Sequence, residues 1–313
     1  MKKLHYSNLK SRRDSYYSFL KPVLNTIEQG WTNLKLREPW LREFHFKATD
    51  IILGNEEMLV KVYLRYKNLY DIWKAGKTDV ERVTLMKSIE EVFNYKKYRS
   101  YIVSYFTDAN NGIDLSTCYY CEMAYINTYS VRGASKNHFD LDHILDRGSC
   151  PMLGLSMLNL VPACQCCNEK IKRSNVFGEG NAAIMQKLMP TSRSFDFDSM
   201  VYITMALKQM PSRKGYVKNK ECYQIKFNLN DSDYTDYIKK LHLCERYDFH
   251  KVEALRLLDL KENYPDITIS KIAKLLGRTP REVHEDLFAE GFNEDTNRCF
   301  SKLRRDIMAE RTI

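Results

Sequence analysis

Apolar residues recur every three or four positions in the first third of the chain, a spacing that predicts amphipathic helices. The clearest such segments are residues 56–73 and 79–106. Thr78 and Asp79 stand where the second segment begins and are good N-terminal caps. The sequence Asp-Ala-Asn-Asn-Gly at 108–112 then interrupts the pattern. We therefore expect a mainly helical N-terminal region that ends at residue 112.

The pattern changes twice in the rest of the chain. Residues 113–176 have no long periodic helix and contain six of the nine cysteines. Residues 201–207 and 223–229 are typical of strands, and helical spacing returns from residue 231. This order predicts an α+β fold. Its expected parts are a helical N-terminal region (1–112), a central core (113–177) and a C-terminal α+β region that binds a target or a partner (178–313).

Composition narrows the class of protein. The chain has 313 residues, 44% of them hydrophobic, which excludes wholesale disorder. It has no run of 18 apolar residues, and its first residues carry charge without an apolar core, so we expect neither a membrane span nor a signal peptide. Nine cysteines in such a chain favour a reducing cytoplasm over a disulfide framework.

The net charge of +9 is unevenly distributed. Residues 1–100 contain 20 Lys and Arg against 12 Asp and Glu, whereas residues 101–150 contain 3 against 6. A basic region beside an acidic one fits a phosphate-binding surface next to a cation site. A solvated helical surface rich in lysine would give the same excess.

Four cysteines have the spacing of a zinc site. Cys118 and Cys121 form one C-x-x-C pair, Cys164 and Cys167 form another, and 42 residues separate the pairs. Two such turns can close a four-sulfur tetrahedral site with no open position, which makes the expected zinc structural. Cys166 lies inside the second pair and is an alternative ligand. The remaining cysteines are expected to be buried thiols: Cys150, Cys222, Cys244 and Cys299.

The residues between and after these pairs suggest catalysis. Residues 140–143 alternate as a strand would, so Asp140 and Asp142 are expected on one face and His143 on the other. A carboxylate beside an imidazole can support metal-assisted phosphodiester hydrolysis. A lone Asp-His pair is more often structural. Asn168, directly after the last cysteine of the second pair, changes that balance, because on the first turn of a helix its side-chain oxygen could complete a cation site with Asp142.

Three basic residues follow on the same predicted helix. Lys170, Lys172 and Arg173 could contact substrate phosphates, although an ordinary solvated helix face would look the same. Asn159 lies upstream in a turn, where an Asn side chain can brace a loop through backbone hydrogen bonds.

The order Asp142-His143, Asn159 and Asn168, beside two C-x-x-C pairs, resembles the HNH nucleases, which have the ββα-metal fold. Residues 139–172 resemble a zinc-stabilised bacterial branch of this family. Some members of that branch act in anti-phage defence, including nuclease subunits that pair with an ATPase in Septu-type systems. The resemblance covers about residues 115–175.

The resemblance implies a role for each residue. His143 would be the general base, Asp142 and Asn168 the ligands of a catalytic Mg²⁺ or Mn²⁺, and Asn159 the residue that orients the loop. The C-x-x-C pairs would form a structural Zn²⁺ knuckle. Where many HNH sequences have proline, this chain has Asp146 and Arg147, so a basic substrate contact is expected at Arg147.

The implied activity is cleavage of nucleic acid, with double-stranded DNA as the expected substrate. An ATPase or sensor protein and a second copy of the chain are candidate partners. Two alternatives remain: a catalytically inactive zinc-dependent nucleic-acid-binding module, and a toxin-like nuclease subunit that a partner ATPase controls.

Two flanking segments also allow nucleic-acid contact. Residues 266–291 are typical of helix, glycine turn and capped helix, as in a helix-turn-helix, but their acidic residues favour a packed helical hairpin. Residues 95–105 interleave aromatic and basic side chains that could stack on bases. At helical spacing this pattern is more typical of a core.

Overall fold

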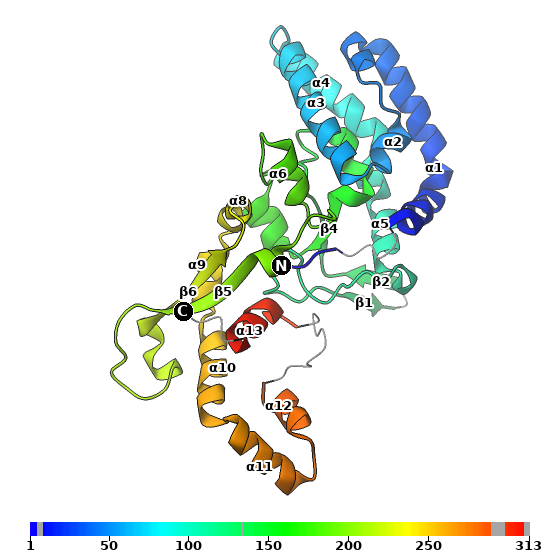
Figure 1. The fold of residues 1–313 in the computed structure, drawn as a ribbon. Helices are drawn as coiled ribbons and strands as arrows, with labels where there is room; N and C mark the ends of the chain where they lie inside the picture. Colours follow the sequence, from blue (N-terminus) through cyan, green and yellow to red (C-terminus); the bar gives the residue numbers. More distant parts are fainter. Residues whose placement is uncertain (5–8, 133, 289–297, 310–313) are drawn as a thin grey trace. The chain divides into compact units, whose positions relative to one another are not determined.

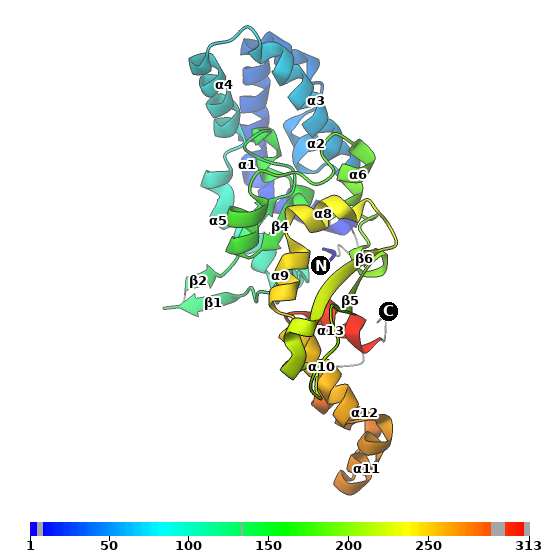
Figure 2. The same cartoon turned by 90° about the vertical axis from the view of Figure 1, so that its left-hand side faces the viewer.

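The computed structural model describes residues 1–4, 9–132, 134–288 and 298–309 (Figures 1 and 2). These residues are mainly helical, and their strands form three two-stranded antiparallel sheets. The predicted α+β class is confirmed at this level. No helix in these ranges is long and apolar enough to cross a membrane.

Contacts divide the chain into two compact units. The larger unit comprises Lys2–Tyr120 and Ile126–Asp196, and the smaller comprises Met1, Cys121–Tyr125 and Phe197–Ile313. The boundaries expected at residues 112 and 177 stay predictions.

Helices of the larger unit pack around an aromatic core. Trp31 and Phe93 are fully buried, with ring centroids 5.5 Å apart and nearly perpendicular planes. The α-helices of this unit are α1 (Leu9–Arg37), α2 (Ala48–Ile52), α3 (Glu56–Lys74), α4 (Asp79–Val92), α5 (Tyr95–Thr107) and α6 (Ala182–Lys187). This unit also contains four short 3₁₀ helices: η1 (Pro39–Glu43) between α1 and α2, η2 (Ala109–Asn111) after α5, and η3 (Pro151–Leu155) and η4 (Met157–Asn159) between the later strands.

The sequence prediction of one helix over residues 79–106 is wrong, because the chain breaks it at Phe93 and Asn94. Helix α4 begins as expected, with Thr78 and Glu81 forming a reciprocal capping box. Helix α5 then starts anew, because the Asn94 side chain accepts a hydrogen bond from the Lys97 backbone N–H at 2.8 Å. Because of this break, α5 can run in a different direction from α4.

Two short sheets follow α5 in the larger unit. Strands β1 (Thr128–Val131) and β2 (Ala134–Asn137) pair as a hairpin, and the β1 side chains are exposed. Strands β3 (Asp140–His143) and β4 (Leu160–Ala163) pair with His143 opposite Leu160. Directly after β4, residues Cys166–Lys172 form η5, a π-helical turn with i→i+5 hydrogen bonds.

The smaller unit contains the two strands predicted at residues 201–207 and 223–229. Strands β5 (Val201–Leu207) and β6 (Tyr223–Leu229) pair antiparallel, and Ile203 donates its backbone N–H to Asp306 at 2.8 Å. The helical elements of this unit are α7 (Phe197–Met200), η6 (Val217–Cys222), α8 (Tyr234–Lys240), α9 (Leu243–Phe249), α10 (Val252–Asn263), α11 (Asp266–Leu276), α12 (Pro280–Phe288) and α13 (Ser301–Met308).

Helices α11 and α12 form the expected helical hairpin. Gly277 ends α11 with φ +64°, a left-handed conformation that glycine adopts without strain. Thr279 then caps α12 together with Glu282. The last part of the segment, residues 289–291, lies outside the described residues.

The cap at Asn94 can be tested by substitution. Replacing Asn94 with Ala should lower the free energy of unfolding by about 1 kcal/mol, because one N–H of α5 loses its partner. Asn94→Ser should retain most of the stability. Urea titrations that find the Ala and wild-type proteins equally stable would contradict this role.

Candidate functional site

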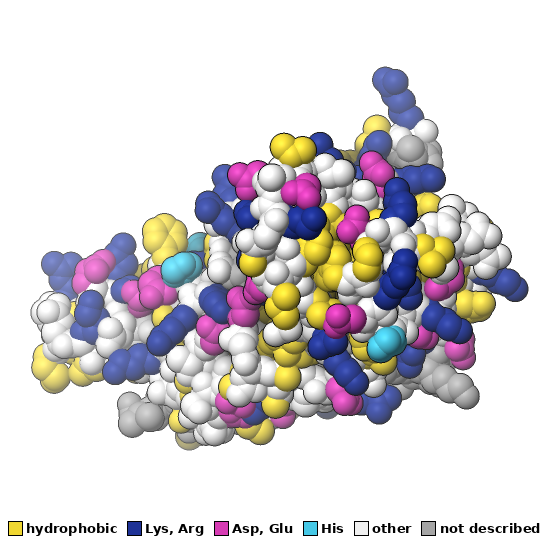
Figure 3. Space-filling model, turned by 90° about the horizontal axis from the view of Figure 1, so that it is seen from above, with side chains coloured by type: hydrophobic (Ala, Val, Ile, Leu, Met, Phe, Trp, Pro, Cys, Tyr) yellow, Lys and Arg dark blue, Asp and Glu magenta, His cyan; other side chains and the backbone are white. Residues whose placement is uncertain are grey.

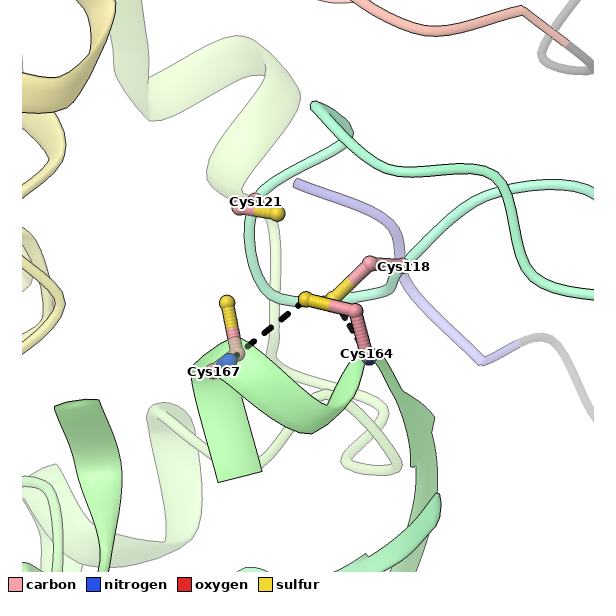
Figure 4. Close-up of side chains that lie close together, drawn as sticks. All are labelled: Cys118, Cys121, Cys164 and Cys167. Atoms are coloured by element: carbon pink, nitrogen blue, oxygen red, sulfur yellow. Dashed lines mark hydrogen bonds between the residues drawn. The ribbon is translucent and has the colours of Figure 1, made fainter. Parts of the chain in front are cut away.

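The two C-x-x-C pairs converge at one point (Figure 4). The sulfur atoms of Cys118, Cys121, Cys164 and Cys167 all lie within 4.8 Å of one another. A tetrahedral ion with bonds of about 2.3 Å needs sulfur–sulfur separations of about 3.8 Å, which this cluster can reach with small adjustments. The four cysteines can therefore hold a metal ion such as Zn²⁺.

Backbone N–H groups point at these sulfurs. The Cys164 N–H lies 3.2 Å from Cys118 Sγ, and the Cys167 N–H lies 3.5 Å from Cys164 Sγ. Such donors stabilise negative charge on thiolates, which is the form that binds metal. Cys166 is exposed and is not part of the cluster.

Asp142 lies inside the protein rather than on its surface. Its side chain is 3% exposed, and its Oδ2 atom accepts hydrogen bonds from the Tyr120 hydroxyl and from Lys172 Nζ, the latter at 3.0 Å. Burial raises the pKa of Asp142, while the ammonium of Lys172 and the hydroxyl of Tyr120 oppose that rise. The carboxylate is thus held by one cation and one hydroxyl.

Lys172 does not have the position expected of a phosphate contact. Its side chain is fully buried, pairs with Asp142 and donates to the backbone oxygen of His143 at 2.8 Å. A phosphate could not reach this ammonium without opening the core, so Lys172 is not placed to contact substrate phosphate as predicted. The π-helical turn directs it inward, which charge and helical spacing did not predict.

His143 is oriented by a backbone carbonyl. Its Nε2 atom lies 3.0 Å from Gly154 O. Because a carbonyl can only accept, Nε2 carries the proton and Nδ1 keeps its lone pair. Burial lowers the pKa of His143 well below its usual value, and the positive charges of Arg147 and Lys172 add to that effect. The ring is therefore neutral near pH 7.

Asn159 braces the segment that follows His143. Its side-chain oxygen accepts from the Leu145 N–H at 2.8 Å, and its amide nitrogen donates to Leu145 O at 3.0 Å and to Leu153 O at 3.2 Å. Asn159 is fully buried. It fixes the loop that begins immediately after His143 and does not line the cavity beside it.

A polar cavity of about 530 Å³ opens beside these residues. Asp142, His143 and Asn168 all line it, so the structure brings these three predicted residues together. The other lining residues are Tyr95, Lys96, Arg99, Asp140, Leu141, Asp146, Arg147, Gly148, Glu169 and Arg173.

The remaining basic candidates differ in position. Arg147 and Arg173 line the cavity, and Arg147 pairs with Glu90 at 3.1 Å. Lys170 is exposed but does not line the cavity. Over the described part of the face drawn in Figure 3, Lys and Arg side chains lie among acidic and apolar ones instead of forming one basic block.

Sequence reasoning missed the contribution of distant residues. Tyr120, inside the first C-x-x-C pair, binds Asp142, and Tyr95, Lys96 and Arg99 come from α5. The basic, aromatic start of α5 was visible in the sequence. Nothing in a local pattern showed that it faces the Asp-His pair.

Comparison with known proteins adds no assignment. No family model matches the chain, and no curated protein or solved structure matches it either.

The cysteine cluster predicts which thiols bind metal. Cys167→Ala should lose most of the bound zinc, expected at about one ion per chain, and should unfold at a lower temperature. Cys166→Ala is the matched control and should keep both properties. Metal analysis and thermal melts of the purified variants measure this, and equal zinc loss in both variants would contradict the assignment.

The buried ion pair predicts a second difference. Lys172→Met should lower the free energy of unfolding by about 3–5 kcal/mol, since it leaves the Asp142 carboxyl buried without its cation. The exposed Lys170→Met control should change it by about 0.5 kcal/mol or less. Adding Asp142→Asn to Lys172→Met should recover part of the loss in chemical denaturation. Similar losses for Lys170→Met and Lys172→Met would refute the pairing.

Proposed function

We propose that this protein is a metal-dependent endonuclease that hydrolyses phosphodiester bonds of nucleic acid, with DNA as the substrate. One observation carries the proposal: Asp142, His143 and Asn168 line one cavity, and the bond between His143 Nε2 and Gly154 O orients the ring there. These groups supply a general base and oxygen ligands for a hard cation in one place.

The local fold supports the resemblance to HNH nucleases. Strand β3 carries Asp142 and His143, β4 pairs with it, and η5 carries Asn168. This strand–strand–helix order is the one that a ββα-metal core requires, although the helical element here is a short π-helical turn. The adjoining cysteine cluster fits the structural zinc knuckle of that core.

The donor set fits a catalytic Mg²⁺ or Mn²⁺. Such ions are usually held by one or two side-chain oxygens together with water and substrate phosphate. Asp142 and the side-chain oxygen of Asn168 would hold the ion, and the two contacts that described side chains make to Asp142 both use Oδ2. When bound, the cation would stabilise charge on the phosphate and on the leaving 3′ oxygen.

The residues of the chain have distinct tasks in this mechanism. His143 Nδ1 accepts a proton from the water that attacks the phosphorus, while the Nε2–H bond to Gly154 keeps the ring oriented. Asn159 fixes the loop behind the histidine. Lys172 holds the Asp142 carboxylate in place from the protein side, so its charge acts on the ligand and not on the substrate.

One such centre cuts one strand. Cleavage of both strands of a DNA duplex would require two copies of the chain, two successive nicks or a partner. An ATPase or sensor protein that controls the nuclease is one such partner, and anti-phage defence is the role that the resemblance suggests. Activity that appears only on co-expression with such a protein would favour this arrangement.

The catalytic role of His143 is tested by plasmid nicking with Mg²⁺ or Mn²⁺. His143→Ala should reduce the nicking rate by about 10²-fold or more, because the base is lost. His138→Ala is the matched control, since His138 is exposed, does not line the cavity and lies five residues upstream. Equal nicking by His143→Ala and His138→Ala would contradict this role, and absence of nicking by the wild type would favour the inactive nucleic-acid-binding module.

A further inference from the structure

The first turn of α5 contributes side chains to the cavity from outside the HNH-like segment. Tyr95, Lys96 and Arg99 line the cavity, although more than 40 residues separate Tyr95 from Asp140 in the sequence. The Asn94 cap and the break after α4 fix where this turn begins. Nothing in the mechanism above uses these three residues.

The Tyr95 ring lies between two residues of the proposed site. Its centroid is 4.5 Å from that of His143 with an interplanar angle of 81°, so the two rings meet edge to face. The guanidinium of Arg147 lies over the same Tyr95 ring, 5.1 Å from its centroid. Tyr95 thus packs against both the proposed base and the guanidinium of Arg147.

The hydroxyl of Tyr95 has no acceptor among the described residues. The side chain is 6% exposed, and its buried hydroxyl lies near Arg99, whose guanidinium can only donate to it. Burial raises the pKa of Tyr95 and the charge of Asp140 adds to that rise, while the charge and hydrogen bonding of Arg99 and the charge of Arg147 oppose it. An anion that enters the cavity beside the two guanidinium groups would supply the acceptor that this hydroxyl lacks.

Each of the two arginines pairs with one carboxylate and still has N–H groups that can donate to another acceptor. Arg99 pairs with Asp140 at 3.3 Å and Arg147 pairs with Glu90 at 3.1 Å. Each guanidinium has five N–H donors, so each can keep its carboxylate and still donate to a phosphate. The pairs orient the donors before substrate arrives.

We propose that the Tyr95 hydroxyl, Arg99 and Arg147 form a phosphate-binding subsite that holds the nucleic-acid strand beside His143. The inference rests on the proposed function and adds to it a substrate contact made by α5. The subsite binds a phosphodiester of the backbone and carries no base specificity of its own. Arg99 and the Tyr95 hydroxyl act in binding, and neither takes part in proton transfer.

The test is binding of a short DNA duplex by the full chain with no divalent cation added, followed by fluorescence anisotropy over a range of salt concentrations. Arg99→Gln should weaken binding about tenfold. It should also reduce the magnitude of the slope of log K against log [salt] by about 0.9, the value for one lost phosphate contact. Arg65→Gln is the matched control, because Arg65 also pairs with a carboxylate at 3.3 Å and is similarly exposed, but lies outside the cavity.

Tyr95→Phe separates a binding role from a structural one. It should weaken binding about fivefold while leaving the melting temperature nearly unchanged, since no described residue accepts a hydrogen bond from the hydroxyl. Tyr98→Phe, on the same helix but outside the cavity, should bind like the wild type.

The outcomes separate the two proposals. If the wild-type protein does not bind the duplex, the proposed function fails and the subsite fails with it. If the wild type binds, but Arg99→Gln behaves like Arg65→Gln or Tyr95→Phe behaves like Tyr98→Phe, only the subsite is overturned. Nicking by the wild type would then still support the proposed endonuclease.

Discussion

The buried ion pair between Asp142 and Lys172 is the interaction on which the candidate site depends. Two opposite charges removed from water are tolerated only when they meet each other and further hydrogen-bond partners. Here Lys172 also donates to the backbone oxygen of His143, and Asp142 also accepts from Tyr120. The pair therefore ties the end of η5 to strand β3 at the residues that line the cavity.

The cysteine cluster constrains the other end of the same element. Cys167 lies in the first turn of η5, and Lys172 is its last residue. With a metal ion holding the thiolates and the ion pair holding the lysine, the seven-residue turn would be fixed at both ends. Asn168 lies between Cys167 and Lys172, so fixing these two residues also fixes the position of Asn168 at the cavity. An isolated turn of this length would not keep such a conformation in water.

Sequence predicted the parts of this protein that depend on local pattern. Residues 201–207 and 223–229 have a composition typical of strands, and they are the two strands of an antiparallel pair. The C-x-x-C spacing likewise predicted the cysteine cluster. The helix break at Asn94 was missed because apolar spacing continues across it, and one cap outweighs that pattern. The burial of Lys172 was missed because tertiary partners, and not residue type, decide where a lysine points. The same limit hid Tyr95 and Arg99, whose place beside His143 depends on contacts between distant parts of the chain.

The reaction that we propose is attack of water, activated at His143, on a phosphodiester with release of the 3′ oxygen. Cleavage of a DNA substrate in H₂¹⁸O with Mg²⁺, followed by mass spectrometry of the products, tests it most directly. The account predicts one ¹⁸O atom in the new 5′-phosphate and an unlabelled 3′-hydroxyl. DNA left intact, or products that end in a 3′-phosphate, would contradict it.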